Sequence, residues 1–216
     1  MTTLCNRVTP LGTLIEASGT RGLLMGNRGQ LKPSHYMKPQ PHDGKAWIAC
    51  LMKDRNGIPI PPVPVKYTKL FILDEVTAFA AGHRPCGGCQ KKRYFQFVDA
   101  WCAVNRKSSD LLDVTLHNER VCSELGGHKP HVVAKLENLP SGTMVRLFEN
   151  GEPHLWLLGQ LFPWSVRGYT SPFVISSLSE VQVITPTSIV KVLQAGFPLP
   201  FNVETTLHPS ILAYAG

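Results

Sequence analysis

Hydrophobic and polar positions follow two different spacings along the chain, and the change falls near residue 136. Before it, apolar residues recur at the three- and four-residue intervals of helices; after it, short alternating runs are typical of strands. We therefore expect an α+β protein. A small α/β half at residues 1–135 is followed by a β-rich, barrel-like half at residues 136–216 that packs on it.

The clearest signals in the first half surround residues 67–102. A strand at 67–73 leads to Asp74, a typical helix N-cap, and Gly82 is placed to end the helix that follows. A second helix is expected after residue 90, with one buried stripe. The stripe consists of Tyr94, Val98, Trp101 and Cys102.

Three further signals complete the predicted elements. A third helix is expected at residues 109–122, with Leu112 and Leu116 facing inward. In the second half, a hairpin and a strand are followed by a short helix between Pro186 and Gly196. The hairpin strands are expected at residues 142–148 and 154–158, and the single strand at 181–184.

Composition places the chain among globular proteins, because 43% of its residues are hydrophobic and its mean hydropathy is −0.03. We find no apolar run of membrane-spanning length and no signal-peptide pattern. The expectation is a cytoplasmic protein with no membrane partner, whose six cysteines stay reduced and available to a metal.

Positive charge is concentrated in the first half. Residues 1–135 carry 19 Lys and Arg against 10 Asp and Glu, whereas residues 136–216 carry 3 against 5. Such a field favours a polyanionic partner, so DNA is expected and RNA is not excluded. The alternative is an ordinary basic surface without a ligand.

The most informative motif is Cys86-Gly-Gly-Cys89, because two thiols two residues apart form half of a tetrahedral zinc site. Gly87 and Gly88 leave room for backbone amides to turn towards the sulfurs. A redox dithiol is the competing interpretation, but that motif needs a strand before the cysteines and a helix opening on them, whereas here a helix precedes.

Residues 71–90 resemble the zinc-binding domain of the Ada DNA-repair protein family. The resemblance rests on the helix that ends in Ala-Ala-Gly and on Arg84-Pro-Cys86-Gly-Gly-Cys89-Gln90. It implies a structural zinc ion bound also by Cys50, and a fourth ligand. Where that family has another cysteine, its nuclease-associated relatives carry a histidine, so the resemblance implies His42 or His35 here.

Methyl transfer, the other activity of that family, is not expected, because the chain lacks a Pro-Cys-His-Arg stretch. The remaining thiols are expected to act as small apolar side chains. They are Cys5, Cys102 and Cys122.

Candidate nucleic-acid contacts come from four places, one of which is Arg120, an anion-binding side chain on the third helix. Cations next to the metal motif and in the first helical turn after it have no structural rationale, because the helix dipole disfavours them there. A glycine-rich loop at residues 21–29 would display an amide and a guanidinium, and an aromatic pair could stack on a base, although a core role is the commoner fate of such residues. These candidates are Arg28, Arg84, Lys91, Lys92, Arg93, Arg120, Trp164 and Tyr169.

Catalytic candidates are Asn27, for positioning substrate or water, and Asp113, His117 and Glu119, for acid, base or charge stabilisation. Asp113 and His117 are four residues apart on the third helix, so the carboxylate could hold the imidazole in one tautomer. An ordinary surface pair is the alternative.

With its Asn6-Arg-Val-Thr-Pro10 start and its Met25-Gly-Asn-Arg-Gly29 and Leu116-His-Asn-Glu-Arg120 elements, the chain as a whole also resembles a group of small bacterial proteins without an assigned activity. Its size is similar to that of small prokaryotic and phage-defence DNA glycosylases. We therefore expect a zinc-stabilised enzyme of DNA repair or phage defence that excises a flipped, damaged or modified base. A non-catalytic zinc module that binds DNA or RNA is the alternative, and a zinc hydrolase comes last, since cysteine-rich sites leave no position for water.

Overall fold

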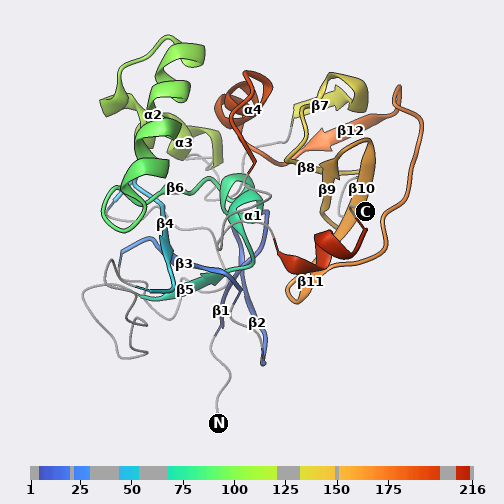
Figure 1. Ribbon diagram of the computed structural model, residues 1–216, viewed down its shortest axis with the longest axis horizontal. Helices are drawn as coiled ribbons and strands as arrows, with labels where there is room; N and C mark the ends of the chain where they lie inside the picture. Colours follow the sequence, from blue (N-terminus) through green and yellow to red (C-terminus); the bar gives the residue numbers. More distant parts are fainter. Residues whose placement is uncertain are drawn as a thin grey trace.

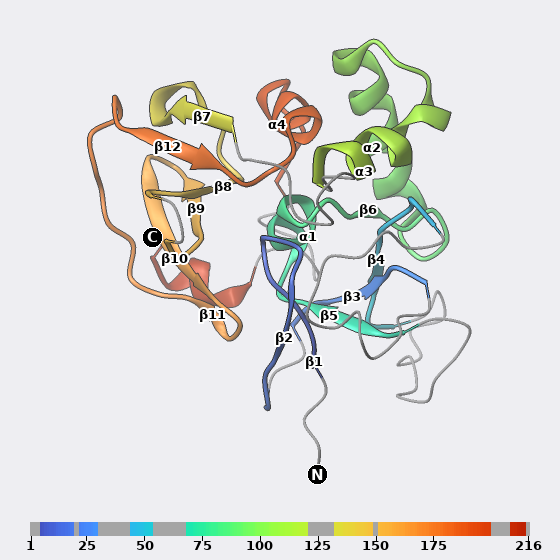
Figure 2. The same cartoon turned by 180° about the vertical axis from the view of Figure 1, so that it is seen from behind.

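The computed structural model describes residues 5–19, 22–29, 44–53, 68–120, 132–148, 151–199 and 208–214. These residues form two six-stranded sheets with helices, so the expected α+β class is confirmed. Figures 1 and 2 show from opposite sides that the sheets lie side by side, with helix α1 (Glu75–Ala80) between them.

The first sheet is mixed, with strand order β2-β1-β5-β3-β4-β6. β1 and β5 are parallel, as are β4 and β6, and the other neighbours are antiparallel. β6 forms the edge of the sheet and pairs with β4, so the loop that follows β6 lies next to β4. The strands are β1 (Cys5–Val8), β2 (Leu14–Glu16), β3 (Leu24–Asn27), β4 (Ile48–Leu51), β5 (Leu70–Ile72) and β6 (Arg84–Pro85).

The second sheet is antiparallel, with strand order β11-β10-β9-β8-β12-β7. The predicted hairpin is confirmed as β8 and β9. The barrel-like arrangement is wrong for the described residues: β11 and β7 are opposite edges that do not pair, and a two-residue β11 is too short to close a barrel. The strands are β7 (Val132–Lys135), β8 (Thr143–Arg146), β9 (His154–Leu157), β10 (Gln160–Ser165), β11 (Gly168–Tyr169) and β12 (Glu180–Val183).

The predicted helices are present with shifted ends. In α2, Val98 and Trp101 are buried as expected, together with Phe97, whereas Tyr94 and Cys102 are only half-buried. The third helix begins as a 3₁₀ turn before it becomes α-helical. The bounds are α2 (Lys91–Asn105), α3 (Leu112–Arg120) and α4 (Thr187–Gln194), with 3₁₀ segments at Ser109–Leu111, Leu136–Asn138 and Pro209–Tyr214.

Helix α1 is buried on all sides and joins the two sheets. Its N-cap is Asp74, as predicted: the carboxylate accepts from the Thr77 backbone N–H at 3.0 Å, and Gly82 at φ +76° follows the helix. The same carboxylate accepts from the Tyr169 hydroxyl and from the His208 backbone N–H, each at 3.2 Å. One buried side chain therefore links α1 to β11 and to the C-terminal 3₁₀ segment.

The aromatic pair of the second half belongs to this junction. Trp164 and Tyr169 are 8% and 4% exposed, and the Trp164 indole N–H donates to the Thr77 hydroxyl at 3.1 Å. The core interpretation of these residues is therefore the one that the structure supports, and neither presents a ring on which a base could stack. None of the described helices is both long and apolar enough to cross a membrane.

Candidate metal centre and the cationic cluster beside it

Three cysteines from two segments meet at the edge of the first sheet. Cys50 lies on β4, and Cys86 and Cys89 lie in the loop between β6 and α2; the three sulfurs are all within 4.8 Å of one another. A tetrahedral zinc ion with Zn–S bonds of about 2.3 Å holds its sulfurs roughly 3.8 Å apart. This donor set fits zinc with little movement.

Two hydrogen bonds to one backbone carbonyl hold the metal loop on β4. The Ala49 carbonyl accepts from the Cys86 backbone N–H at 2.9 Å and from the Gln90 side-chain amide at 2.8 Å. Because Cys50 follows Ala49, these bonds fix both ends of the loop beside the third sulfur.

Backbone amides also point at the sulfurs, as the glycines predict. The Gly88 N–H donates to Cys86 Sγ and the Leu51 N–H donates to Cys89 Sγ, each at 3.3 Å. Gly87 has a separate reason to lack a side chain, because a Cβ there would meet the Tyr94 ring at 3.3 Å. The loop is therefore shaped both to stabilise thiolates and to pack on α2.

The thiols also influence each other's ionisation. Hydrogen bonds from Cys50 and Cys89 lower the pKa of Cys86 to about 2, whereas hydrogen bonds to its two neighbours raise the pKa of Cys50. Three thiols so close together share their protons unevenly, and a cation that replaces those protons relieves the conflict. Among the described residues the cluster has three members; the predicted fourth ligands, His42 and His35, lie outside them.

The order of elements around the cysteine pair does not exclude a redox dithiol, contrary to the expectation from the sequence. A two-residue strand, β6, directly precedes Cys86, and α2 opens just after Cys89, so the strand-motif-helix order is present after all. The deciding feature is instead Cys50: a third sulfur beside the pair is typical of a metal site. Of the other thiols, Cys5 and Cys102 are half-buried and Cys122 lies outside the described residues.

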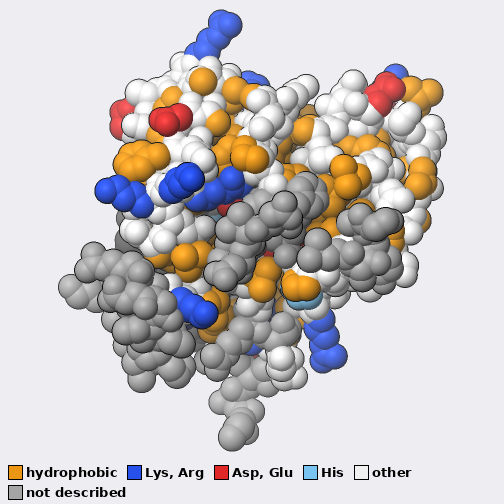
Figure 3. All heavy atoms as spheres, viewed as in Figure 1, with side chains coloured by type: hydrophobic (Ala, Val, Ile, Leu, Met, Phe, Trp, Pro, Cys, Tyr) orange, Lys and Arg blue, Asp and Glu red, His pale blue; other side chains and the backbone are white. Residues whose placement is uncertain are grey.

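The cations around the metal loop divide into engaged and free groups. Arg84 forms two bonds to the Asp113 carboxylate, at 2.8 and 2.9 Å, and Arg93 pairs with Glu75. Lys91 and Lys92 are exposed, and neither has an ion-pair partner among the described residues. Figure 3 shows a row of Lys and Arg side chains on the side where α2 begins in Figure 1.

The expectation that Arg28 is displayed at a loop tip is wrong. Arg28 is 4% exposed, because its guanidinium lies over the Trp47 ring and donates to His83 and to the Gly12 carbonyl. Arg120, also predicted as a nucleic-acid contact, is 7% exposed and lies over the same ring.

The catalytic candidates are not brought together as predicted. Asn27 is the last residue of β3 and its side chain accepts from the Gly29 N–H. Asp113 is bound to Arg84 rather than to His117, and Glu119 accepts from the Ser188 N–H and hydroxyl, at the start of α4. Burial, then the charges of Arg120 and Lys45, lower the pKa of His117, so its imidazole is neutral.

Two features escaped the sequence analysis. The Arg28, Trp47 and Arg120 cluster unites residues that are distant in the chain, so no local pattern could have revealed it. Phe95 is different: its spacing from Lys91 and Lys92 places all three on one face of α2, and it is 51% exposed. The sequence did carry a signal for this exposure, because Phe95 is an aromatic residue outside the predicted buried stripe of α2.

No protein-family model matches the chain, and neither a curated protein nor a solved structure is significantly similar to it.

Proposed function

We propose that the protein is a zinc-stabilised nucleic-acid-binding protein that uses the exposed face of α2. The observation that carries the proposal is the combination of Lys91, Lys92 and Phe95 beside the three-cysteine cluster. Ammonium groups bind phosphates, and an exposed ring supplies the stacking surface that single-stranded nucleic acids use.

The start of α2 supports this choice. Gln90, its N-cap, makes no side-chain capping bond, and the first turn contains no acidic residue. Two lysines there oppose the helix dipole and weaken the isolated helix, so a contact outside the chain explains them better than folding does. An anion at this end would satisfy free amides and lysines together.

Zinc would support this surface by fixing the position of the start of α2. With Cys50, Cys86 and Cys89 bound to one ion, the metal loop is fixed to β4, and α2 begins at the second residue after Cys89. The ion supplies a rigid crosslink and no reaction step. Its removal should disorder the start of α2 and, with it, the binding face.

Excision of a modified base stays a prediction from the sequence. Asp113 and Glu119 each hold a structural partner, which supports binding over catalysis as the main proposal. Incubation with plain, damaged and hypermodified DNA, followed by alkali, tests excision. Strand breaks in one substrate would make the protein a glycosylase, and intact DNA that is still retarded in a gel would favour the binding module.

The binding surface is tested by measuring affinity for single-stranded and duplex DNA and RNA at several salt concentrations. Lys91→Gln combined with Lys92→Gln should weaken binding about tenfold and reduce the slope of log K against log salt by roughly 1.5. Phe95→Ala should weaken single-strand binding by about tenfold without changing that slope.

A matched control removes the same charge elsewhere. Lys135→Gln combined with Arg167→Gln changes two exposed cations of the second sheet and should leave affinity nearly unchanged. Equal losses in both double variants would mean a diffuse basic surface, and absence of binding at low salt would reject the proposal.

A further inference from the structure

The ring of Phe95 is held in place by its neighbours before any ligand binds. It meets the Tyr94 ring edge to face, with the two centroids 5.4 Å apart, and the Arg84 guanidinium lies 5.1 Å from the centroid of the Tyr94 ring. Tyr94 also packs on the metal loop at Gly87. Phe95 is nevertheless 51% exposed. A ring that is already fixed loses little conformational freedom when a base stacks on it.

An acidic side chain lies one turn beyond Phe95 on the same face of α2. Asp99 is exposed, and among the described residues its carboxylate has no ion-pair partner. The residues three and four positions away from it on the helix include no cation; they are Phe95, Gln96, Cys102 and Ala103. No ion pair within α2 therefore accounts for this carboxylate, and its charge opposes the phosphates that the lysines of the first turn attract.

Lysines, ring and carboxylate follow one another along α2. Side chains of a helix lean towards its N-terminus, so Asp99 extends over the turn that carries Phe95, and Phe95 over the turn of Lys91 and Lys92. The helix rises about 10–12 Å from these lysines to Asp99. This rise is comparable with the length of one nucleotide from its phosphate to the outer edge of its base. On the side where α2 lies in Figure 1, Figure 3 shows apolar and acidic side chains above the row of Lys and Arg side chains.

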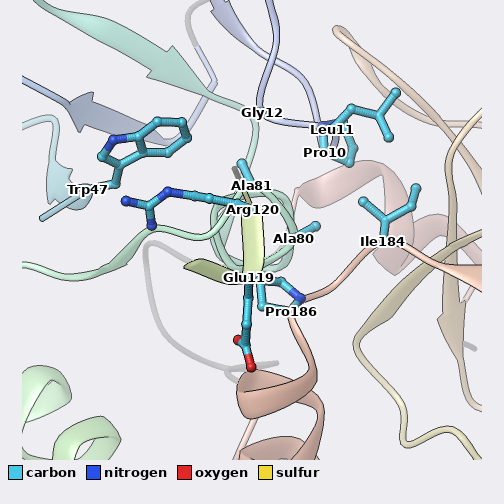
Figure 4. Close-up of a pocket in the computed structure, with 10 residues that line it drawn as sticks. All are labelled: Pro10, Leu11, Gly12, Trp47, Ala80, Ala81, Glu119, Arg120, Ile184 and Pro186. Atoms are coloured by element: carbon cyan, nitrogen blue, oxygen red, sulfur yellow. The ribbon is translucent and has the colours of Figure 1, made fainter. Parts of the chain in front are cut away.

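The hollow beside Trp47 offers no comparable set of groups to a base. Its two charged lining residues are Glu119 and Arg120, and Figure 4 shows Arg120 extending towards Trp47 and Glu119 towards the start of α4. Glu119 accepts from the Ser188 hydroxyl, and Arg120 donates to the Gly82 carbonyl, each at 2.6 Å. Because these charged groups point in different directions and are bound within the chain, they do not converge on one base edge. The exposed face of α2 is therefore the better place for base recognition.

We infer that this face of α2 selects guanine in a single strand, an inference that rests on the proposed nucleic-acid binding. With the phosphate at the lysines and the base on Phe95, the edge that would pair in a duplex faces Asp99. An ionised carboxylate offers two acceptor oxygens and no donor. Guanine is the base whose pairing edge carries two adjacent donors, N1–H and the N2 amine, so it can form two charge-assisted bonds with Asp99. Thymine and uracil instead present two carbonyl oxygens there, which repel a carboxylate.

The test measures the affinity of the full zinc-loaded chain for short single strands by fluorescence anisotropy. The strands are oligothymidylate, and oligouridylate for RNA, in which only the central base is varied. Guanine at that position should tighten binding about tenfold over thymine or uracil, as one bidentate contact does. Inosine, which lacks the N2 amine, should lose most of this gain, whereas 7-deazaguanine, whose pairing edge is intact, should keep it. The opposite order would place the contact at N7 and overturn the inference.

Variants of Asp99 show whether the carboxylate makes the selection. Asp99→Ala should bind strands with a central guanine or thymine equally well, and it should fold as wild type does, because alanine is favourable on an exposed helix face. Asp99→Glu, which keeps a carboxylate on a longer side chain, should retain part of the preference. Asp110→Ala is the matched control, since Asp110 is an exposed acid of the 3₁₀ segment Ser109–Leu111, outside this face of α2. It should keep the full preference.

The outcomes separate guanine selection from the binding on which it rests. If all strands bind with the same affinity whatever their central base, guanine selection is wrong and nucleic-acid binding stands. A guanine preference that is undiminished in Asp99→Ala would likewise overturn the role of Asp99 alone. Absence of binding to every strand at low salt would overturn both proposals.

Discussion

The two sheets differ in what they bury. Around the first sheet, the interior holds the charged side chains of Arg28 and Arg120, and three thiols meet at its edge. The buried carboxylates of Asp74 and Glu75 lie at the start of the helix between the sheets. The second sheet buries mainly apolar side chains, and the polar ones among its described residues are neutral, such as Thr143.

This contrast distinguishes the apolar burial that stabilises a fold from buried charges and thiols that do not. The six short strands of the second sheet pair over an apolar cluster, with no buried charged side chain among their described residues. Buried ions and clustered thiols in the first sheet cost stability, so they indicate a metal, a ligand or both.

The largest predicted effect is loss of the metal. Cys50→Ser or Cys86→Ser should abolish binding of a single zinc ion and unfold the first sheet, because structural zinc contributes about 10–16 kcal/mol, as much as a whole domain's stability. Zinc content by mass spectrometry and amide exchange over β4, β6 and α2 measure this.

Cys102→Ala is the control for the metal prediction, since this half-buried thiol packs on the apolar cluster of α2. It should keep the zinc ion and the exchange pattern. A Cys50→Ser protein that retains tightly bound zinc would contradict the three-cysteine site.

A change in the second sheet should act differently. Leu161 is fully buried in β10, and Leu161→Ala should lower the free energy of unfolding by about 2–5 kcal/mol through loss of packing and the cavity left behind. Urea unfolding measures the loss. Zinc content should not change. A variant that lost zinc would show that the metal site depends on the packing of the second sheet.

The third prediction concerns Asp74, the buried carboxylate between the sheets. Burial raises its pKa above the value of about 3.9 found in unfolded chains, so the native state keeps a proton that the unfolded state releases. Wild-type stability should therefore fall as pH rises above that value, by at most about 1.4 kcal/mol per unit.

Asp74→Asn removes this titration while keeping an oxygen that can accept from Thr77. Above about pH 4, near which unfolded chains ionise, the stability of the variant relative to wild type should rise with pH until Asp74 has also ionised in the native state. Glu119, whose pKa burial also raises, is common to both proteins and cancels. Glu75, whose pKa burial and the Asp74 charge raise, loses that repulsion in the variant, which adds to the same trend. Parallel pH profiles in urea unfolding would argue against a raised Asp74 pKa.

The smallest predicted effect is that of Glu119→Gln. The amide can still accept from Ser188, so only the attraction between a carboxylate and the start of α4 is lost, about 1 kcal/mol or less. Nucleic-acid affinity should stay the same. A change in any DNA cleavage or excision activity with unaltered Tm would instead give Glu119 a catalytic role.

Local patterns predicted the parts of the fold that local physics determines. Asp74 and Gly82 bound α1 as expected, and the spacing of Cys86 and Cys89, with Cys50 from the family resemblance, led to the metal cluster. These features depend on capping, turn geometry and ligand spacing, which a few neighbouring residues decide.

Long-range contacts could not be read in this way. Arg28 was expected at the tip of a glycine-rich loop and Arg120 as an anion contact on the third helix, but both are buried against Trp47, far from each of them in sequence. Arg84 likewise found Asp113, and the edges of the second sheet stayed apart because β11 is so short.

Helix α1 has a consequence for dividing this chain into fragments. A helix of six residues with no solvent face cannot persist alone, and its neighbours come from both sheets: Ala78 packs with the first, and Val76 and Ala80 pack with the second. A fragment that keeps the first sheet and the metal loop without the second sheet should therefore lose half of the packing that holds this helix.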